Sequence, residues 1–487
     1  MTGPGALSGR APVVVVGDVL LDVDVDGAAH RLSPEAPVPV ISGATERRRP
    51  GGAGLAALLA SRLHSRVVLI APVADDAAGA EVVALLSGRV EVIPVPWGGT
   101  TAVKTRLRAN GHPVTRLDRG GDPGRVGRLP DAARSALASA EAVLVADYGL
   151  GCTSDRGVRA ALAAAARRIP LVWDPHPRGA APVAGARLVT PNESEAAAYL
   201  PDEAGTGLAT AGRRAAGLAT MWEAGAVALT LGSRGALLSY GAGAPSLLPA
   251  APVRADDTCG AGDAFAAAAA VALGRGLLPS EAVAQAVRYA AGFVAAGGAA
   301  TVELEPAQGT AERAAAQDAA ARPAGPESAD VERVLETVRA SGGRVVATGG
   351  CFDLLHAGHV DMLEAARALG DLLVVCLNSD DSVRRLKGAG RPLQPQQDRA
   401  RILGALRCVD AVVVFDEDTP ETVLARVRPD LWVKGGDYGG ADLPEAQVVT
   451  EAGGQVLTLP YLAGRSTSDL VDTVRRRRLP QHEAAGQ

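Results

Sequence analysis

The chain has 487 residues, of which 47% are hydrophobic and 3% aromatic, and its formal net charge at pH 7 is −5. This length exceeds one ordinary core and predicts two or three domains. An acidic balance argues against nucleic-acid and membrane-surface partners, which require a basic field.

Three further features favour a cytoplasmic protein with no membrane partner. The apolar runs are far shorter than the ~20 residues of a membrane span. The N-terminal segment lacks the apolar region of a signal peptide. The five cysteines are scattered and form no CxxC pair, as expected for a reducing compartment.

Short Val- and Leu-rich strands alternate with Ala-rich helical segments, which is the βαβ pattern of parallel sheets. The main-sheet strands predicted in the first half are Val13–Gly17, Val67–Pro72, Ala142–Asp147, Leu171–Asp174, Leu188–Thr190 and Ala226–Leu231. A separate small β lid is predicted from Leu20–Asp26, Val38–Ser42, Thr100–Arg108 and Val114–Asp118.

A second, smaller sheet is predicted from Arg344–Ala347, Leu372–Leu377, Ala411–Phe415, Leu431–Lys434 and Gln455–Leu459. Residues 306–328 are rich in Ala, Pro, Gly and Gln, a composition typical of a linker. The expected organisation is therefore a first domain at 11–305, a linker at 306–328 and a second domain at 329–478.

The strongest motif of the first domain is Asp257-Thr-Cys-Gly-Ala-Gly-Asp263, which precedes a helix of small residues. Gly260, Ala261 and Gly262 can turn successive N–H groups toward one point and form a pocket for phosphoryl oxygens. Asp263 stands at the edge of this pocket, where it can take a proton from an acceptor hydroxyl. An ordinary helix-capping aspartate is the alternative, and the seven-residue spacing disfavours it.

The first domain resembles the ribokinase (PfkB) family of sugar kinases over nearly its whole length. The matching segments are Asp22 after Gly17, Pro50-Gly51-Gly52-Ala53, Asn192-Glu193-Ser194-Glu195 and Thr230-Leu-Gly232-Ser-Arg-Gly235. The chain departs from the family pattern at Leu55, Leu150 (in Asp147-Tyr-Gly-Leu-Gly151) and His176, where the family has Asn, Lys and Lys.

The resemblance implies a role for each matching residue. Asp22, Gly51 and Gly52 would bind the sugar. Asn192 and Glu195 would organise the ATP phosphates and Mg²⁺, which is held through the phosphates with Glu195 as a candidate ligand. The nucleotide side would be formed by Thr230, Gly232 and Gly235.

Three lid segments, Arg31–Val40, Lys104–Arg106 and Arg116–Asp118, narrow the resemblance to the heptose 7-phosphate kinases. In these enzymes basic lid residues hold the phosphate that the substrate already carries, so Lys104, Arg106 and Arg116 would do so here. A solvated basic lid face is the alternative. A P-loop at 98–105 is excluded because Val103 replaces the glycine that the loop requires.

The second domain opens with Thr348-Gly-Gly-Cys-Phe-Asp-Leu-Leu-His-Ala-Gly-His359, which joins a predicted strand to a helix. His356 and His359 are three residues apart and share one helix face. They lie at a helix N-terminus, where free N–H groups and the helix dipole favour phosphate. The arrangement suits attack on the α-phosphate of a nucleoside triphosphate, with the imidazoles stabilising the developing charge. A metal pair is the alternative, but no third and fourth ligands lie nearby in the sequence.

This motif resembles the TxGxFDxxHxGH signature of a nucleotidyltransferase superfamily, in which Thr348, Gly350 and Phe352 belong to the nucleotide site. The remaining motifs of this superfamily follow in sequence order. The resemblance assigns Lys387 to the sugar phosphate, Lys434 to catalysis on phosphate, and Arg399, Asp437, Ser466 and Thr467 to ATP.

A ribokinase-like domain with a small β lid, followed by a Rossmann-like HxGH domain, is the layout of the bifunctional heptose 7-phosphate kinase/heptose 1-phosphate adenylyltransferases. The resemblance implies ATP and Mg²⁺, phosphorylation of D-glycero-β-D-manno-heptose 7-phosphate at C1, and adenylyl transfer giving ADP-heptose and pyrophosphate. It further implies a homodimer and a separate phosphatase. The alternatives are an active adenylyltransferase with a degenerate or differently specific kinase domain, and a non-catalytic sugar-phosphate sensor.

Overall fold

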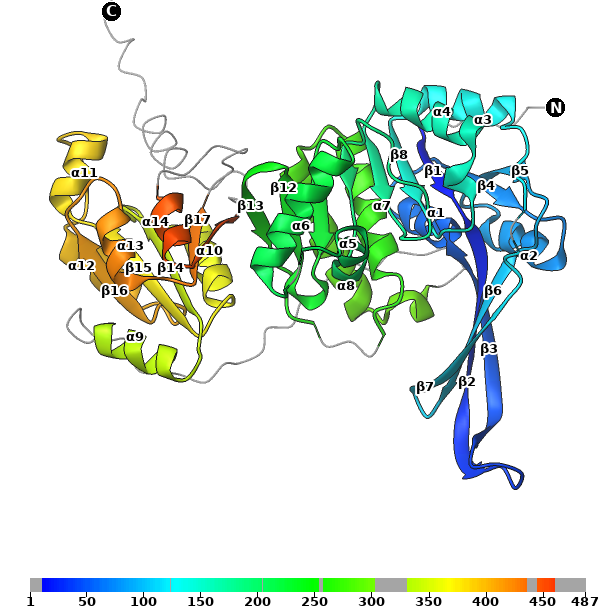
Figure 1. The fold of residues 1–487 in the computed structure, drawn as a ribbon, viewed down its shortest axis with the longest axis horizontal. Helices are drawn as coiled ribbons and strands as arrows, with labels where there is room; N and C mark the ends of the chain where they lie inside the picture. The colour runs from blue at the N-terminus through cyan, green and yellow to red at the C-terminus, as the bar shows by residue number, and fades with distance from the viewer. Residues whose placement is uncertain are drawn as a thin grey trace, which may run out of the picture. The chain divides into compact units, whose positions relative to one another are not determined.

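The computed structural model describes residues 11–122, 124–203, 205–253, 257–302, 331–435 and 445–459. The chain divides into two compact units, one made of residues 1–242 and 248–308 and the other of residues 309–487 with 243–247 (Figure 1). The predicted linker at 306–328 lies outside the described residues. No helix in the described ranges is long and apolar enough to cross a membrane.

The first unit is built on one twisted sheet with the strand order β12-β11-β10-β9-β8-β1-β4-β5. All neighbours pair in parallel except β11 and β12. The strands are β1 (Val13–Gly17), β4 (Val67–Val73), β5 (Glu91–Pro96), β8 (Ala142–Ala146), β9 (Leu171–Asp174), β10 (Leu188–Val189), β11 (Val227–Thr230) and β12 (Ala236–Tyr240), followed in sequence by β13 (Ala242–Leu248). The central strands are continuously apolar because a parallel sheet is buried on both faces.

Ala-rich helices cover this sheet, and α7 packs against α1, α8 and β8. Small side chains allow α7 to be buried along nearly its whole length. The helices are α1 (Ala53–Ser61), α2 (Ala77–Leu86), α3 (Asp131–Ser139), α4 (Arg156–Ala166), α5 (Glu193–Tyr199), α6 (Leu208–Met221), α7 (Ala261–Gly274) and α8 (Pro279–Ala295), with short 3₁₀ turns η1 (Cys152–Ser154), η2 (Gly232–Arg234) and η3 (Gly298–Thr301).

A separate four-stranded sheet forms the lid of this unit, as the sequence predicted. Its order is β3 (Pro39–Gly52), β2 (Val19–Leu32), β6 (Ala102–Ala109) and β7 (His112–Arg119). β2 and β3 are longer than predicted and project beyond the main sheet (Figure 1). In the register between β2 and β6, acidic residues lie opposite basic ones: Asp22 opposite Lys104, Asp24 opposite Arg106 and Asp26 opposite Arg108.

The second unit contains a parallel five-stranded sheet with the order β16-β15-β14-β17-β18. The strands are β14 (Val345–Gly350), β15 (Leu372–Asn378), β16 (Ala411–Phe415), β17 (Leu431–Gly435) and β18 (Gln455–Leu459), so all five predicted strands are confirmed. The helices are α9 (Val331–Ala340), α10 (Ala357–Arg367), α11 (Asp380–Lys387), α12 (Gln396–Gly404), α13 (Glu421–Val427) and α14 (Ala446–Glu451). The chain order reverses between β14 and β17, and such a switch point is where open α/β sheets bind ligands.

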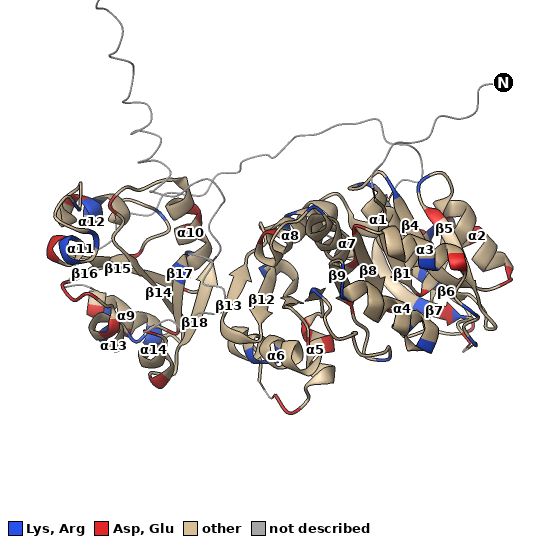
Figure 2. Cartoon of the chain, turned by 90° about the horizontal axis from the view of Figure 1, so that it is seen from above, with Lys and Arg blue, Asp and Glu red and all other residues tan. Residues whose placement is uncertain are grey.

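Charged residues are nearly absent from the strands of both main sheets and occur instead on the lid, on loops and on surface helices such as α5, α11 and α12 (Figure 2). On the lid and on α11 the two signs are interleaved rather than separated, because most arginines there pair with a neighbouring carboxylate. Both predicted sites lie at the ends of apolar strands, next to charged side chains.

Candidate active sites

The loop Asp257–Gly262, whose last two residues already belong to α7, lines a large cavity of the first unit. Gly260, the residue before the helix, has φ 81°, a left-handed conformation that favours glycine, and a Cβ there would meet Leu55 at 3.1 Å. The cavity has a volume of ≈ 650 Å³, and we call it the nucleotide cavity. It brings together the predicted residues Asn192, Thr230, Gly232, Gly235, Ala261 and Gly262.

Glu195 lies beside the nucleotide cavity and forms a capping box with Asn192 at the start of α5. The Asn192 side chain accepts the Glu195 N–H at 2.9 Å, and Glu195 accepts the Asn192 N–H at 2.8 Å. Burial raises the pKa of Glu195. Within the described ranges, no three His, Cys, Asp or Glu side chains cluster as a ready-made metal site. That Mg²⁺ is held mainly through the ATP phosphates, with Glu195 as a candidate ligand, stays a prediction.

Asp263 lies in the first turn of α7 and is only 7% exposed. The Tyr148 hydroxyl donates a hydrogen bond to its Oδ1 at 2.7 Å. Burial raises the pKa of Asp263 to about 7, against the lowering effect of the Tyr148 hydrogen bond. A carboxylate whose pKa lies near the working pH is well suited to act as a general base. The sequence analysis missed Tyr148, although the segment Asp147–Gly151 that carries it resembles a family motif.

Asp18, which the sequence analysis also missed, fixes the segment that presents Tyr148. Its carboxylate accepts the N–H groups of Tyr148, Leu150 and Cys152 at 3.1, 3.0 and 2.9 Å. Leu150 therefore helps to anchor this segment through its main-chain N–H. The other two residues that depart from the family pattern are Leu55 and His176. Leu55 is buried in the hydrophobic core, and burial lowers the pKa of His176.

A second cavity, of ≈ 400 Å³, lies between the lid and the loop Asp257–Gly262, and we call it the lid cavity. It is lined by Arg106, Arg108, Pro113, Val114, Thr115, Arg116, Asp257 and Cys259. Arg106 and Arg116 thus lie together as predicted, with Arg116 exposed and paired with Asp118 at 2.9 Å. Lys104 is placed elsewhere, with its ammonium 5.3 Å from the centre of the Tyr148 ring.

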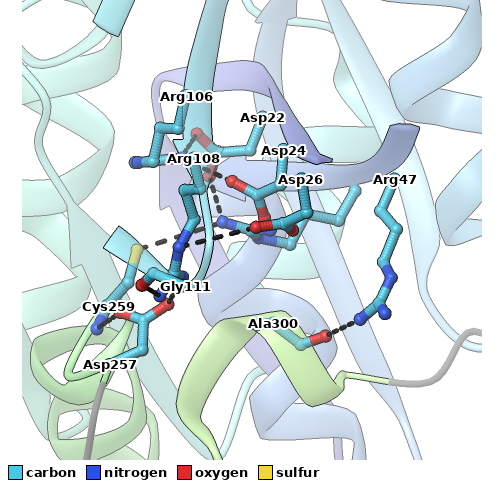
Figure 3. Close-up of polar contacts among 11 residues, drawn as sticks. Asp22, Asp24, Asp26, Arg47, Arg106, Arg108, Gly111, Asp257, Cys259 and Ala300 are labelled. Carbon is cyan, nitrogen blue, oxygen red and sulfur yellow. Dashed lines mark hydrogen bonds and ion pairs between the residues drawn. The ribbon is translucent and has the colours of Figure 1, made fainter. Parts of the chain in front are cut away.

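The predicted sugar carboxylate, Asp22, is buried among arginines of the lid (Figure 3). Arg106 donates to its Oδ1 at 2.6 Å, and Arg49 lies 3.8 Å from its Oδ2. Gly51 is required beside it, because a Cβ there would stand 2.7 Å from the same carboxylate. The sequence analysis missed Arg49, which contacts both Asp22 and Asp24. An acidic residue at every second position of β2 was the signal that could have indicated a paired arginine, because such residues share one strand face.

Neighbouring residues of the loop face different cavities. Thr258, Ala261 and Gly262 line the nucleotide cavity, whereas Asp257 and Cys259 line the lid cavity. The loop therefore separates the two cavities, and Asp263 follows immediately after it.

In the second unit, His356 is the residue before α10 and His359 lies in its first turn. Their rings stack with centroids 3.9 Å apart, and Phe352 lies 5.2 Å from the His359 ring. Burial, with the charges of His356 and Lys387, lowers the pKa of His359 to about 4, and burial lowers the pKa of His356. Both imidazoles are therefore neutral at pH 7 before a phosphate arrives. The charge of Lys387 is near enough to contribute to the lowered pKa of His359.

Thr348 and Arg399, which were both predicted as ATP-binding residues, are buried in the second unit. Both side chains are 0% exposed. The Arg399 guanidinium donates to the main-chain oxygens of Gln394, Cys351 and Asn378 and to the carboxylate of Asp380. The assignment of Thr348 and Arg399 to the ATP site stays a prediction, and in this structure the Arg399 guanidinium is engaged by internal partners. Arg399 thereby ties the end of β14 to the end of β15.

Asp353 of the motif is likewise an internal anchor. It is buried, pairs with Arg391, and accepts the N–H groups of Leu393 and Gln394. These contacts hold the segment Arg391–Gln394 against the motif.

Lys434 is the penultimate residue of β17, which lies next to β14, and its ammonium lies 2.8 Å from the carboxylate of Glu445. Although burial acts in the opposite direction, the hydrogen bond and charge of Lys434 lower the pKa of Glu445. Glu445 also accepts the indole N–H of Trp432 at 3.2 Å. The predicted residues Asp437, Ser466 and Thr467 lie outside the described residues.

Comparisons with known proteins identify both units. The family of pfkB carbohydrate kinases matches residues 10–306, and the cytidylyltransferase-like family matches residues 347–450. The chain is 56% identical over 474 residues to Bifunctional protein HldE of Streptomyces coelicolor, covering 97% of this chain and 98% of that protein. It is 41% identical over 481 residues to Bifunctional protein HldE of Azorhizobium caulinodans, covering 96% and 98% of the two chains.

Among solved structures, Arabidopsis thaliana ribokinase complexed with ribose and ATP aligns with 59% of this chain and 93% of its own, at 20% identity and a TM-score of 0.47. The full-length identity to curated relatives is the stronger finding. The chain belongs to the family of HldE bifunctional proteins, with a pfkB-type carbohydrate kinase in its first unit and a nucleotidyltransferase in its second.

Proposed function

We propose that this protein makes an ADP-activated heptose in two separate steps. The first unit transfers the γ-phosphate of ATP to the C1 hydroxyl of D-glycero-β-D-manno-heptose 7-phosphate. The second unit transfers AMP from ATP to heptose 1-phosphate and releases pyrophosphate. The proposal extends family membership to particular substrates, which the names of the relatives do not state.

The observation that carries the kinase step is the position of Asp263 beside the loop that separates the two cavities. ATP in the nucleotide cavity and a sugar phosphate in the lid cavity would meet at Gly260–Asp263. The acceptor hydroxyl gives its proton to Asp263, its oxygen bonds to the γ-phosphorus, and the bond to the ADP oxygen breaks. The N–H groups at the start of α7 face the transferring phosphoryl oxygens. Mg²⁺, when bound, neutralises charge on the ATP phosphates.

The preference for a phosphorylated sugar is supported by the arginines of the lid cavity. Arg106, Arg108 and Arg116 all line it, and no lysine does. Planar guanidinium groups match phosphate oxygens in pairs, so a sugar with a distal phosphate fits this lining better than a neutral sugar. Lys104 would lie close to the acceptor end, since its charge acts on Asp263.

The adenylyl transfer is assigned to His356 and His359 at the N-terminus of α10. A phosphate oxygen of heptose 1-phosphate bonds to the α-phosphorus of ATP, and pyrophosphate leaves. Burial lowers the pKa of both imidazoles, and a neutral imidazole still has one N–H that can be donated to the α-phosphate oxygens. Lys387 and Lys434 would add positive charge around the sugar phosphate and the triphosphate.

We propose two partners, a separate phosphatase and a second copy of this chain. The kinase product carries a 7-phosphate that the nucleotide sugar lacks, so a separate phosphatase must act between the two steps. We also propose a homodimer formed through the lid, whose edge strand β7 is exposed along its whole length.

The test is mass-spectrometric product analysis of the purified full chain with ATP, Mg²⁺ and candidate heptose phosphates. We expect a bisphosphate plus ADP from heptose 7-phosphate, and ADP-heptose plus pyrophosphate from heptose 1-phosphate. Asp263→Asn should abolish only the first product and His356→Asn only the second. If only the second product forms with any sugar tested, the kinase unit is degenerate. If neither ADP nor pyrophosphate is released, the proposal is wrong.

A further inference from the structure

Arg108 lines the lid cavity and also connects the lid to the loop that forms the anion pocket. It lies on β6, and its guanidinium donates to Oδ2 of Asp257 at 3.1 Å (Figure 3). The other oxygen of this carboxylate, Oδ1, accepts the main-chain N–H of Cys259 at 2.9 Å. One carboxylate therefore joins a lid arginine to the main chain directly before Gly260.

The opposite side of Cys259 is linked to the lid as well. Its carbonyl oxygen accepts the N–H of Ala299 at 3.0 Å, in the 3₁₀ turn η3. The next residue, Ala300, accepts a hydrogen bond from Arg47 of β3 at 3.2 Å (Figure 3). Both polar groups of the Cys259 main chain are thus held by segments that lid arginines contact.

The position of Gly260–Gly262 depends on these contacts. The N–H groups of this segment must point at the transferring phosphoryl group, and catalysis by such donors is sensitive to small displacements. The Arg108 side chain is 20% exposed and the Asp257 side chain 26% exposed, so the pair is partly shielded from water and is stronger than a surface ion pair.

We infer that Arg108 is a positioning residue of the kinase site: through Asp257 it holds the Cys259–Gly262 main chain in the geometry that receives the γ-phosphate. This inference rests on the proposed kinase activity. Arg108 also lines the lid cavity, and Asp26 lies 3.6 Å from its Nε.

The experiment compares Arg108→Gln, Arg108→Lys, Asp257→Asn and the double variant Arg108→Gln/Asp257→Asn with the wild-type full chain. We expect Arg108→Gln to lower kinase kcat by roughly 10- to 100-fold, with the KM of the sugar phosphate changed less than about threefold. Asp257→Asn should give a similar loss, and the double variant should lose no more than either single one, because both remove one shared contact. Arg108→Lys should restore part of the loss.

Arg48→Gln is the matched control. Arg48 lies on β3 and is about half exposed, and it pairs with Glu46 and Glu81 rather than with the loop, so its replacement should leave kcat unchanged. Nucleotidyl transfer by the same chain reports only on the second unit, so thermal unfolding of the full chain shows whether the first unit of each variant is folded. If Arg108→Gln raises the KM of the sugar phosphate and leaves kcat intact, Arg108 is only a phosphate ligand and the inference is wrong.

A second readout does not depend on kinase turnover. Hydrogen–deuterium exchange of the amides in residues 257–263 should be at least several-fold faster in Arg108→Gln than in the wild type, while Arg48→Gln matches the wild type. Equal exchange in Arg108→Gln and the wild type would overturn the inference. Absence of ADP from the wild-type chain with every sugar phosphate would instead refute the proposed kinase, and the exchange comparison would still decide the role of Arg108.

Discussion

Replacing Tyr148 with Phe should shift the pH dependence of the kinase without destroying its site. The change removes one hydroxyl, which donates to Asp263 at 2.7 Å. The aromatic ring remains, so the contact of Lys104 with the ring face is preserved. Because Asp263 is buried and its pKa is already raised to about 7, loss of the hydrogen bond should raise this pKa further.

The expected size follows from the strength of hydrogen bonds to charged groups. Such a bond stabilises a carboxylate by at least about 1.5 kcal/mol, and one pKa unit corresponds to about 1.4 kcal/mol. The pKa of Asp263 should therefore rise by about one unit. At pH 7 the ionised fraction would fall from about one half to about one eleventh, so kcat/KM should fall about fivefold. Near pH 9 the loss should almost vanish.

The assay is ADP release by the full chain between pH 5.5 and 9.5, with kcat/KM for the sugar phosphate plotted against pH. The acid limb reports the base of the free enzyme, so it should move to higher pH in Tyr148→Phe. Tyr199→Phe is the matched control, since the Tyr199 hydroxyl donates to the main-chain oxygen of His176 and not to a carboxylate. A loss in Tyr148→Phe that is equal at every pH would refute the reasoning.

Three further substitutions have equally direct outcomes. Asp263→Asn should lower kinase turnover by on the order of 10²- to 10⁴-fold. The pKa of Asp263 rises from 3.8 to about 7 on folding. The stability that this group contributes is therefore present below pH 4 and is lost as the pH rises to 7. Asp263→Asn should accordingly raise the unfolding temperature at pH 8 but not at pH 4. Equal shifts in scanning fluorimetry at both pH values would contradict this. His356→Asn should lower pyrophosphate release by roughly 10²- to 10³-fold and leave ADP release from the kinase unchanged. Arg399→Lys should lower the free energy of unfolding of the second unit by on the order of 3 kcal/mol in urea titrations, because it breaks a buried pair. Unchanged stability with a raised KM for ATP would instead favour Arg399 as an ATP ligand.

The sequence was sufficient for the features that depend on local order along the chain. Strand positions followed from runs of Val and Leu between helical segments, and all five strands of the second sheet were predicted. Six residues of the nucleotide cavity were also predicted: Ala261 and Gly262 from the glycine-rich motif, and Asn192, Thr230, Gly232 and Gly235 from the resemblance to the ribokinase family.

The partners of charged and polar side chains were decided only by the tertiary structure. Tyr148 and Asp263 are 115 positions apart, and Arg108 and Asp257 are 149 apart, so no local pattern could pair them. Arg399 shows the same limit: its motif position predicted a phosphate ligand, and only the structure places its guanidinium against main-chain oxygens. The physical reason is that periodicity depends on neighbours in the chain, whereas burial, hydrogen bonding and pKa depend on which distant segments pack around a group.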